Sequence, residues 1–123
     1  MAGKTEYIIQ NDIRFGPMAK FSIPKLVSDC AHPWFNQSLV RVNDCVARMG
    51  IFHGEFHWHH HDQEDELFYV VTGKLLVDFE DRTEELGPGE GIMVPRGTRH
   101  RTRAPEKTVT LMFEGAGVVP TGD

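Results

Sequence analysis

Histidine is concentrated in one stretch of this chain of 123 residues. The sequence holds seven histidines, and four of them fall within residues 57–61. An acidic stretch follows at once, with carboxylates at Asp62, Glu64, Asp65 and Glu66. Imidazole nitrogens and carboxylate oxygens that converge on one point are ligands for divalent transition metals. The stretch therefore predicts a metal site.

Strand geometry sorts these histidines onto two faces, because side chains alternate along a β-strand. One face of an expected strand carries His57, His59 and His61. The opposite face carries Phe56, Trp58 and His60. A structural or interface role is therefore expected for His60, and surface positions are expected for His32 and His53.

Two ligand sets have the spacing that one metal ion needs. The first is His57 and His59 with Glu64, and the second is His59 and His61 with Glu66. Alternation alone does not separate them. The second set is favoured because an apolar strand begins directly after Glu66, whereas Glu64 is expected in an exposed hairpin.

Short strands separated by turn residues account for most of the chain after residue 37. They are expected at 38–42, 45–52, 55–61, 66–72, 74–80, 91–94, 99–103 and 108–114. A short helix is expected after Ser22, which would cap it, with Pro24 in the first turn. Eight short strands and no long amphipathic helix predict an all-β antiparallel barrel or sandwich.

Composition indicates a single domain of ordinary globular type. Its net charge of −5 argues against nucleic-acid binding, and no apolar run approaches the roughly 18 residues of a membrane span. The start of the chain lacks the apolar segment of a secretory signal. Two cysteines, Cys30 and Cys45, are expected to be small buried side chains in a reducing compartment. We therefore expect a cytoplasmic protein.

Two motifs resemble those of the cupin superfamily. The first is His59-x-His61, then Glu66 after four residues and Gly73 after six more. The second is Gly89, then Pro95-x-Gly97 after five residues and His100 after two more. Two positions depart from the family pattern: Gly54 lies five residues before His59 instead of six, and Ala104 stands where the family often has asparagine.

The resemblance implies a small single-domain cupin of the type 2, conserved-barrel kind. Its fold would be a jelly-roll barrel, also called a double-stranded β-helix, with an irregular or short-helical N-terminal segment. We expect the N-terminal segment at 1–37, packed on the barrel or a partner subunit, the barrel at 38–114 and a tail at 115–123. Similar cupins form dimers, so a homodimer is expected.

The resemblance also implies one divalent transition metal, among Fe, Mn, Ni, Co, Cu and Zn. Its ligands would be His59, His61, Glu66 and His100. Four ligands leave open coordination positions, which favours an enzyme of the oxygenase or isomerase and lyase type acting on a small polar molecule. A non-catalytic metabolite-binding module and a structural metal-bound barrel are the alternatives.

Further positions could line or flank the pocket. Phe68 and Val70 share the face of Glu66, and His57 is a candidate for a catalytic role, a polar lining residue or a residue that orients a ligand. On the last strand, two sets alternate: Val109, Leu111 and Phe113, or Thr110, Met112 and Glu114. Either set could face the cavity.

Two outward-facing groups are also expected. Arg96, Arg99, Arg101 and Arg103 surround His100. They could bind an anion at the barrel mouth, but a solvated edge strand or an inter-subunit salt-bridge strip facing acids such as those at 78–85 is favoured. The second group would form an apolar patch for a second subunit or the N-terminal segment: Phe56, Trp58, Leu67, Tyr69 and Val71.

Overall fold

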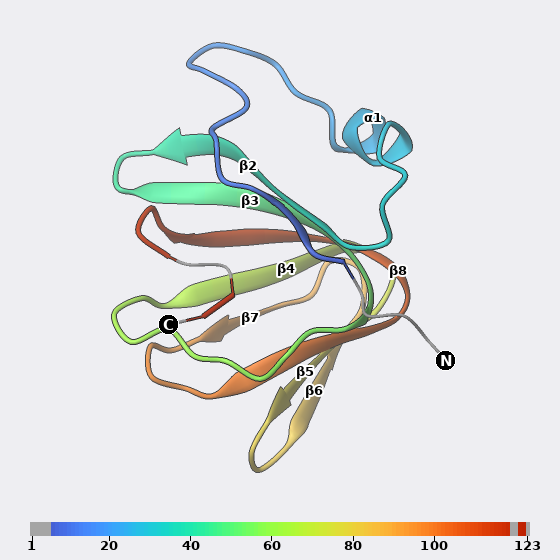
Figure 1. The fold of residues 1–123 in the computed structure, drawn as a ribbon, viewed down its shortest axis with the longest axis vertical. Coiled ribbons are helices and arrows are strands. Elements are labelled where there is room, and N and C mark those ends of the chain that lie inside the picture. The colour runs from blue at the N-terminus through green and yellow to red at the C-terminus, as the bar shows by residue number, and fades with distance from the viewer. Residues whose placement is uncertain (1–5, 119–120, 123) are drawn as a thin grey trace.

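The structure is a computed structural model that describes residues 6–118 and 121–122 (Figure 1). One short helix, α1 (Ile23–Ser28), precedes most of the strands. The strands are β1 (Ile8–Gln10), β2 (Phe35–Val42), β3 (Cys45–Glu55), β4 (Glu66–Thr72), β5 (Leu75–Phe79), β6 (Thr83–Leu86), β7 (Gly91–Val94) and β8 (His100–Gly115).

Strand β8 joins the two halves of the barrel. Its first residues pair with β5, and its later residues pair with β3 on one side and β4 on the other. The strand order is β1-β2-β3-β8-β4-β7, with β5 attached to β8 and β6 attached to β5. All pairings are antiparallel except that of β1 with β2. The expected antiparallel jelly-roll barrel is therefore confirmed.

Apolar side chains are buried on both faces of this sheet. Inside the barrel, aromatic and aliphatic residues such as Trp34, Phe52 and Phe68 form one cluster. Outside it, Leu26 of α1 packs against Met49 and other residues of the outer face. Figure 1 shows α1 and the preceding segment lying beside β2. The barrel interior is thus closed by its own aromatic side chains, and the N-terminal segment covers part of the outside.

Local sequence signals explain the short helix and the tight turn between β4 and β5. Ser22 Oγ accepts the backbone N–H of Lys25 at 3.3 Å, which caps α1 as expected. Gly73, between β4 and β5, has φ 90°, and a Cβ there would lie 2.7 Å from the carbonyl oxygen of Lys107. Only glycine fits this turn, which fixes where β4 ends.

Most of the expected strands are present, with differences in their number and extent. The segments expected at 99–103 and 108–114 form one continuous strand, β8, and β1 and β6 were not expected. Because β8 lies between β3, β4 and β5, its arginines are not on an edge strand. Cys45 is exposed at the start of β3, directly after the Asn43–Asp44 turn, so the expectation that it is buried is wrong.

The strand expected at 55–61 is wrong beyond Glu55. The chain leaves β3 and pairs with β8 only through an isolated bridge between His59 and His100. Without a continuous ladder, strict alternation of side chains is lost. Phe56 consequently packs inside the barrel, and Trp58 lies half-buried against Arg99 and Arg101. The outward patch therefore does not include Phe56.

Candidate metal centre

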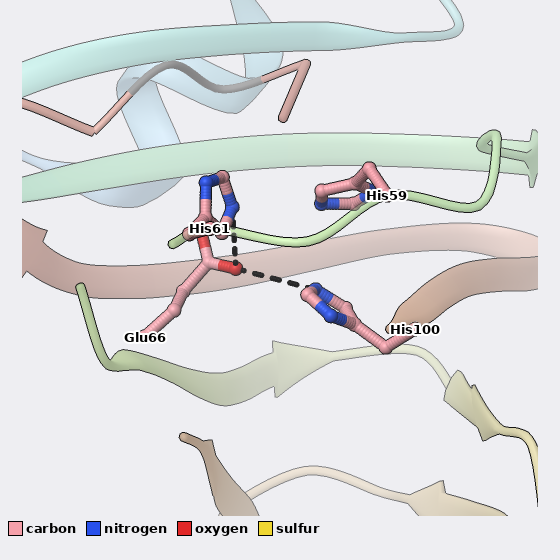
Figure 2. A group of neighbouring side chains, drawn as sticks. All are labelled: His59, His61, Glu66 and His100. Carbon is pink, nitrogen blue, oxygen red and sulfur yellow. Dashed lines mark ion pairs between the residues drawn. The ribbon is translucent and has the colours of Figure 1, made fainter. Parts of the chain in front are cut away.

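Four side chains from three separate segments converge inside the barrel. His59 and His61 come from the loop after β3, Glu66 is the first residue of β4, and His100 is the first residue of β8. Each offers one ligand atom, and these atoms all lie within 4.8 Å of one another. We call these four residues the inner cluster. Figure 2 shows the Glu66 carboxyl group facing His61 and His100, with His59 alongside.

Backbone hydrogen bonds hold the histidine loop against the strand that carries His100. The backbone N–H of each of His59 and His100 donates to the carbonyl oxygen of the other, both at 2.9 Å. The N–H of Gly97 donates to the carbonyl oxygen of His61 at 2.8 Å. These bonds bring residues about forty positions apart in the sequence to one point.

The ligand atoms of the inner cluster are buried and lack partners. The four residues are between 1% and 8% exposed. His61 Nε2, His100 Nε2 and Glu66 Oε1 make no hydrogen bond, and the Glu66 oxygen lies 3.5 Å from His61 Nε2 and 3.6 Å from His100 Nε2. Buried polar atoms without partners are costly, and donors around one ion at roughly 2.1 Å are themselves roughly 3–4 Å apart. The donor set therefore fits a metal ion.

Two of the imidazoles are oriented by backbone carbonyls. His59 Nδ1 lies 3.0 Å from the carbonyl oxygen of His57, and His100 Nδ1 lies 2.9 Å from that of Thr98. Because a carbonyl can only accept, the proton sits on Nδ1 in both rings. Nε2 of each ring therefore carries the lone pair that a metal requires.

Protonation also suits metal binding at two of the ligands. Burial lowers the pKa of His59 to about 4, so this ring is neutral at pH 7. Burial raises the pKa of Glu66, but the neighbouring side chains of Glu114, His100 and His61 outweigh it and hold that pKa below its ordinary value. Glu66 is therefore a carboxylate, and His59 offers a free lone pair.

A second buried carboxyl group adjoins the cluster and was not predicted as part of it. Glu114 lies opposite Glu66 across the β4–β8 pairing, and its pKa is raised by burial and by the neighbouring Glu66. Arg48 Nε lies 2.5 Å from Glu114 Oε1. One sequence signal marks both residues, since Glu66 is the only charge in residues 66–72 and Glu114 is the only charge in residues 108–114.

The sequence left open which of two alternating sets of side chains on β8 faces the interior. The structure places the set with Thr110, Met112 and Glu114 there. Thr110, Met112 and Glu114 are buried, whereas Phe113 is exposed. On β4, Phe68 and Val70 are buried as expected and belong to the interior cluster. A small cavity of about 20 Å³ touches His59, Glu66 and Phe68. Val70 lies outside the lining of that cavity.

His57 lies beside the inner cluster and is not a member of it. Its side chain is exposed, and its Nε2 donates to the carbonyl oxygen of Thr121 at 2.6 Å. Its backbone carbonyl, by contrast, orients His59. The next residue of the tail, Gly122, lies so close that a Cβ there would be 2.5 Å from the Cβ of His59. The tail thus covers one side of the site.

The arginines around His100 meet acids of their own chain. Asp78, on β5, accepts three hydrogen bonds through its carboxylate. The donors are Arg101 Nε at 2.8 Å, Arg103 Nη2 at 2.8 Å and Thr83 Oγ1 at 2.6 Å. We call these four residues the outer cluster. Arg99 lies 3.8 Å from Glu80, and Arg96 is exposed. The arginines thus meet acids of 78–85, as expected, but these contacts lie within one chain and not between subunits.

The other histidines lie away from the inner cluster. His32 and His53 are exposed, as expected. His60 Nε2 lies 3.0 Å from Asp62 Oδ1, in a half-exposed pair.

No helix in the described ranges has the length and apolar character needed to span a membrane.

Comparisons with known proteins agree with this fold. The Cupin_2 family model (Cupin domain) matches residues 52–114, which is more than half of the chain. YdbB, an uncharacterized protein of Bacillus subtilis (strain 168), is 46% identical over 80 residues, which cover 64% of this chain and 71% of that protein. SchB of Streptomyces halstedii is 38% identical over 66 residues, 53% of this chain and 48% of SchB.

A solved structure extends the likeness to three dimensions. The crystal structure of a cupin-2 domain containing protein from Shewanella frigidimarina NCIMB 400 aligns with a TM-score of 0.74 and 28% identity. The alignment covers 77% of this chain and 93% of that protein. Together with the family match over residues 52–114, it shows that the chain belongs to the cupin family.

Proposed function

We propose that this cupin binds one divalent transition metal through the inner cluster and acts as an enzyme on a small polar molecule. The observation that carries the proposal is the convergence of four buried donors whose ligand atoms lie within 4.8 Å and include three without hydrogen-bond partners. A bound ion would supply Lewis-acid or redox chemistry at coordination positions that four protein ligands leave open.

The side chains that line the cavity beside the inner cluster limit which molecules can reach a bound ion. The cavity beside His59 and Glu66 has a volume of about 20 Å³, room for one water-sized molecule. Its walls are mostly aromatic, with Phe52, Phe56 and Phe68 among them. Asn36 also lines it, and its buried Oδ1 has no hydrogen-bond partner. The cavity therefore has room only for a small ligand and offers it one acceptor.

Element analysis of freshly purified protein tests the metal. We expect one transition-metal ion per chain in the wild type and less than about a tenth of that in the double variant His59→Ala with His61→Ala. His32→Ala with His53→Ala removes two exposed histidines and is the matched control, expected to keep its metal. A wild type without metal, or a double variant that retains it, would contradict the proposal.

The reaction class is tested on the metal-loaded protein. Oxygen uptake with small hydroxy acids, diketones and thiols would support an oxygenase. Conversion of hydroxy acids without oxygen uptake would support an isomerase or lyase. Binding of such a molecule without turnover would favour the metabolite-binding module instead.

One observation favours the structural alternative enough to test it. The four donors are nearly fully buried, and the adjoining cavity holds one water-sized molecule. A closed site has no exchangeable position, whereas an open one binds small anions. We expect azide to change the visible absorption of the Co²⁺-loaded protein. An unchanged spectrum at saturating azide would support a structural metal.

We also propose that the chain forms a homodimer through the outer face of β4, β7 and β8. Leu67 lies opposite Met93 and Phe113, and these two are 52% and 42% exposed. Adjacent Tyr69 is 40% exposed. This patch holds no charged side chain, so a second copy of itself is a complementary partner. Sedimentation should give twice the 14.0 kDa chain mass, and Phe113→Glu should give a monomer; a monomeric wild type would contradict this.

A further inference from the structure

A buried arginine–glutamate pair adjoins the inner cluster without belonging to it. Arg48 of β3 and Glu114 of β8 contribute side chains that are 4% and 1% exposed, joined Nε to Oε1 at 2.5 Å. Such a pair adds little net stability over an apolar pair of the same volume, because both charges must leave water. Its position beside the ligand Glu66 suggests another use.

Glu114 lies beside Glu66 in the barrel wall. The two residues are direct cross-strand partners, and both are buried, at 4% and 5% exposure. Glu66 Oε1 makes no hydrogen bond and faces the Nε2 atoms of His61 and His100. Glu66 thus has Glu114 as its cross-strand neighbour, while its Oε1 is presented to the histidine donors.

Arg48 is itself fixed by neighbours from two other segments. Its Nη1 donates to Ser38 Oγ on β2 at 2.7 Å and to Asn11 Oδ1 at 2.9 Å. Asn11 follows β1 in the segment before the barrel strands. The contacts therefore run from the N-terminal segment through Arg48 and Glu114 to Glu66.

We propose that Glu114, held by Arg48, is a positioning residue that aims Glu66 Oε1 at the three imidazoles and so raises the affinity of the inner cluster for metal. The inference rests on the proposed function, since it concerns the same ion. Hydrogen-bond partners of metal ligands typically contribute 10- to 100-fold to metal affinity, because they fix the ligand in its binding orientation.

Titration of metal-free protein with Co²⁺, followed by visible absorption, tests this role. Arg48→Met with Glu114→Leu removes both charges and keeps the core filled, so the chain is expected to fold. We expect this double variant to bind Co²⁺ about 10- to 100-fold more weakly, with a shifted spectrum. Glu114→Gln keeps an oxygen for Arg48 and an N–H for Glu66, and we expect its affinity within about threefold of the wild type.

Two further variants separate positioning from general loss of stability. Thr110→Val removes a buried hydroxyl from the same face of β8 and should leave affinity and spectrum unchanged. Asn11→Ala, at an exposed position, keeps the ion pair and removes one of the two side chains that hold Arg48 Nη1. It should weaken binding by about threefold, and it tests the same contacts if the double variant fails to fold.

The outcomes distinguish this inference from the proposed function. If the wild type binds Co²⁺ and the Arg48 and Glu114 double variant binds it equally well with the same spectrum, the positioning role is overturned while the metal site stands. Equal losses in Thr110→Val and the double variant would overturn it too. A wild type that binds no Co²⁺ overturns the proposed function and, with it, the positioning role.

Discussion

Two polar clusters lie on opposite faces of the barrel wall at the start of β8. His100 points inward to the inner cluster, and Arg101, the next residue, points outward to the outer cluster. In the outer cluster, both oxygens of Asp78 accept hydrogen bonds from arginine. In the inner cluster, His61, His100 and Glu66 keep atoms without partners.

This difference separates a cluster that stabilises from one that binds. A satisfied buried charge network contributes to folding, and breaking it leaves an uncompensated charge. Convergent buried donors without partners cost stability until a ligand supplies the missing interaction. Variants of the outer cluster should therefore change unfolding, and variants of the inner cluster should change metal binding.

The largest effect on unfolding is expected in the outer cluster. Asp78→Ala removes the acceptor that serves Arg101, Arg103 and Thr83. We expect it to lower the free energy of unfolding of the metal-free protein by about 3 kcal/mol, or roughly 10 °C in Tm. Asp81→Asn, at an exposed neighbouring pair, is the control and should change it by less than about 0.5 kcal/mol.

Denaturant unfolding in the presence of a chelator measures the free energy of unfolding of both variants. A metal-free Asp78→Ala protein as stable as the wild type would show that the outer cluster is not a stabilising network. A His100→Leu variant that loses as much stability as Asp78→Ala would remove the contrast between the clusters.

The second-largest effect is expected from metal binding, which should stabilise the folded state. At a free metal concentration of 100 times Kd, the wild type should gain about 2.7 kcal/mol in its free energy of unfolding. Asp78→Ala should gain the same increment, because its inner cluster is intact. His61→Leu should gain none. Thermal unfolding with and without added Co²⁺ gives each increment, and an equal gain in His61→Leu would place the metal elsewhere.

Acid should weaken the metal-free protein through the inner cluster first. The pKa of His59 is lowered to about 4, so the unfolded state takes up a proton more readily, and stability falls as pH drops from 6.5 towards 4. The lowered pKa of His59 accounts for a loss of about 1–2 kcal/mol in the free energy of unfolding by pH 5. Asp78, whose pKa is held below its ordinary value chiefly by Arg103, adds a loss only below about pH 4.

Unfolding curves at several pH values resolve the two contributions. His59→Gln should flatten the stability profile between pH 7 and 5, and His53→Gln, at an exposed position, should leave it as in the wild type. A profile unchanged by His59→Gln would contradict the assignment.

The smallest effect is expected at the exposed ion pair next to the outer cluster. Arg99 and Glu80 lie 3.8 Å apart, with side chains 53% and 71% exposed. Such pairs contribute little because solvent screens them. Arg99→Ala should change the free energy of unfolding by less than about 0.5 kcal/mol, measured as above. A loss approaching that of Asp78→Ala would show that the arginines act as one network.

The sequence predicted the barrel and the four inner residues for physical reasons that are local. Apolar runs bounded by turn residues mark strands, and Glu66 stands where an apolar strand begins. Alternation on β4 correctly placed Phe68 and Val70 inside, because β4 is a continuous strand paired on both sides.

The incorrect and missing predictions concern residues whose positions are determined by tertiary contacts. Phe56 was assigned outward because a strand was assumed through His61, and the ladder is interrupted there. The pairing of Glu114 with Glu66 depends on the register between β8 and β4, which no local pattern specifies. The contacts of Arg48 with Asn11 and Glu114 join three segments that are distant in the sequence.

Anomalous X-ray diffraction at the absorption edge of the metal found by element analysis tests the central claim most directly. The account predicts one anomalous peak per chain, at roughly 2.0–2.3 Å from a donor atom of each inner-cluster residue. A crystal with no peak there, or with its peak at another site such as His60 and Asp62, would contradict it.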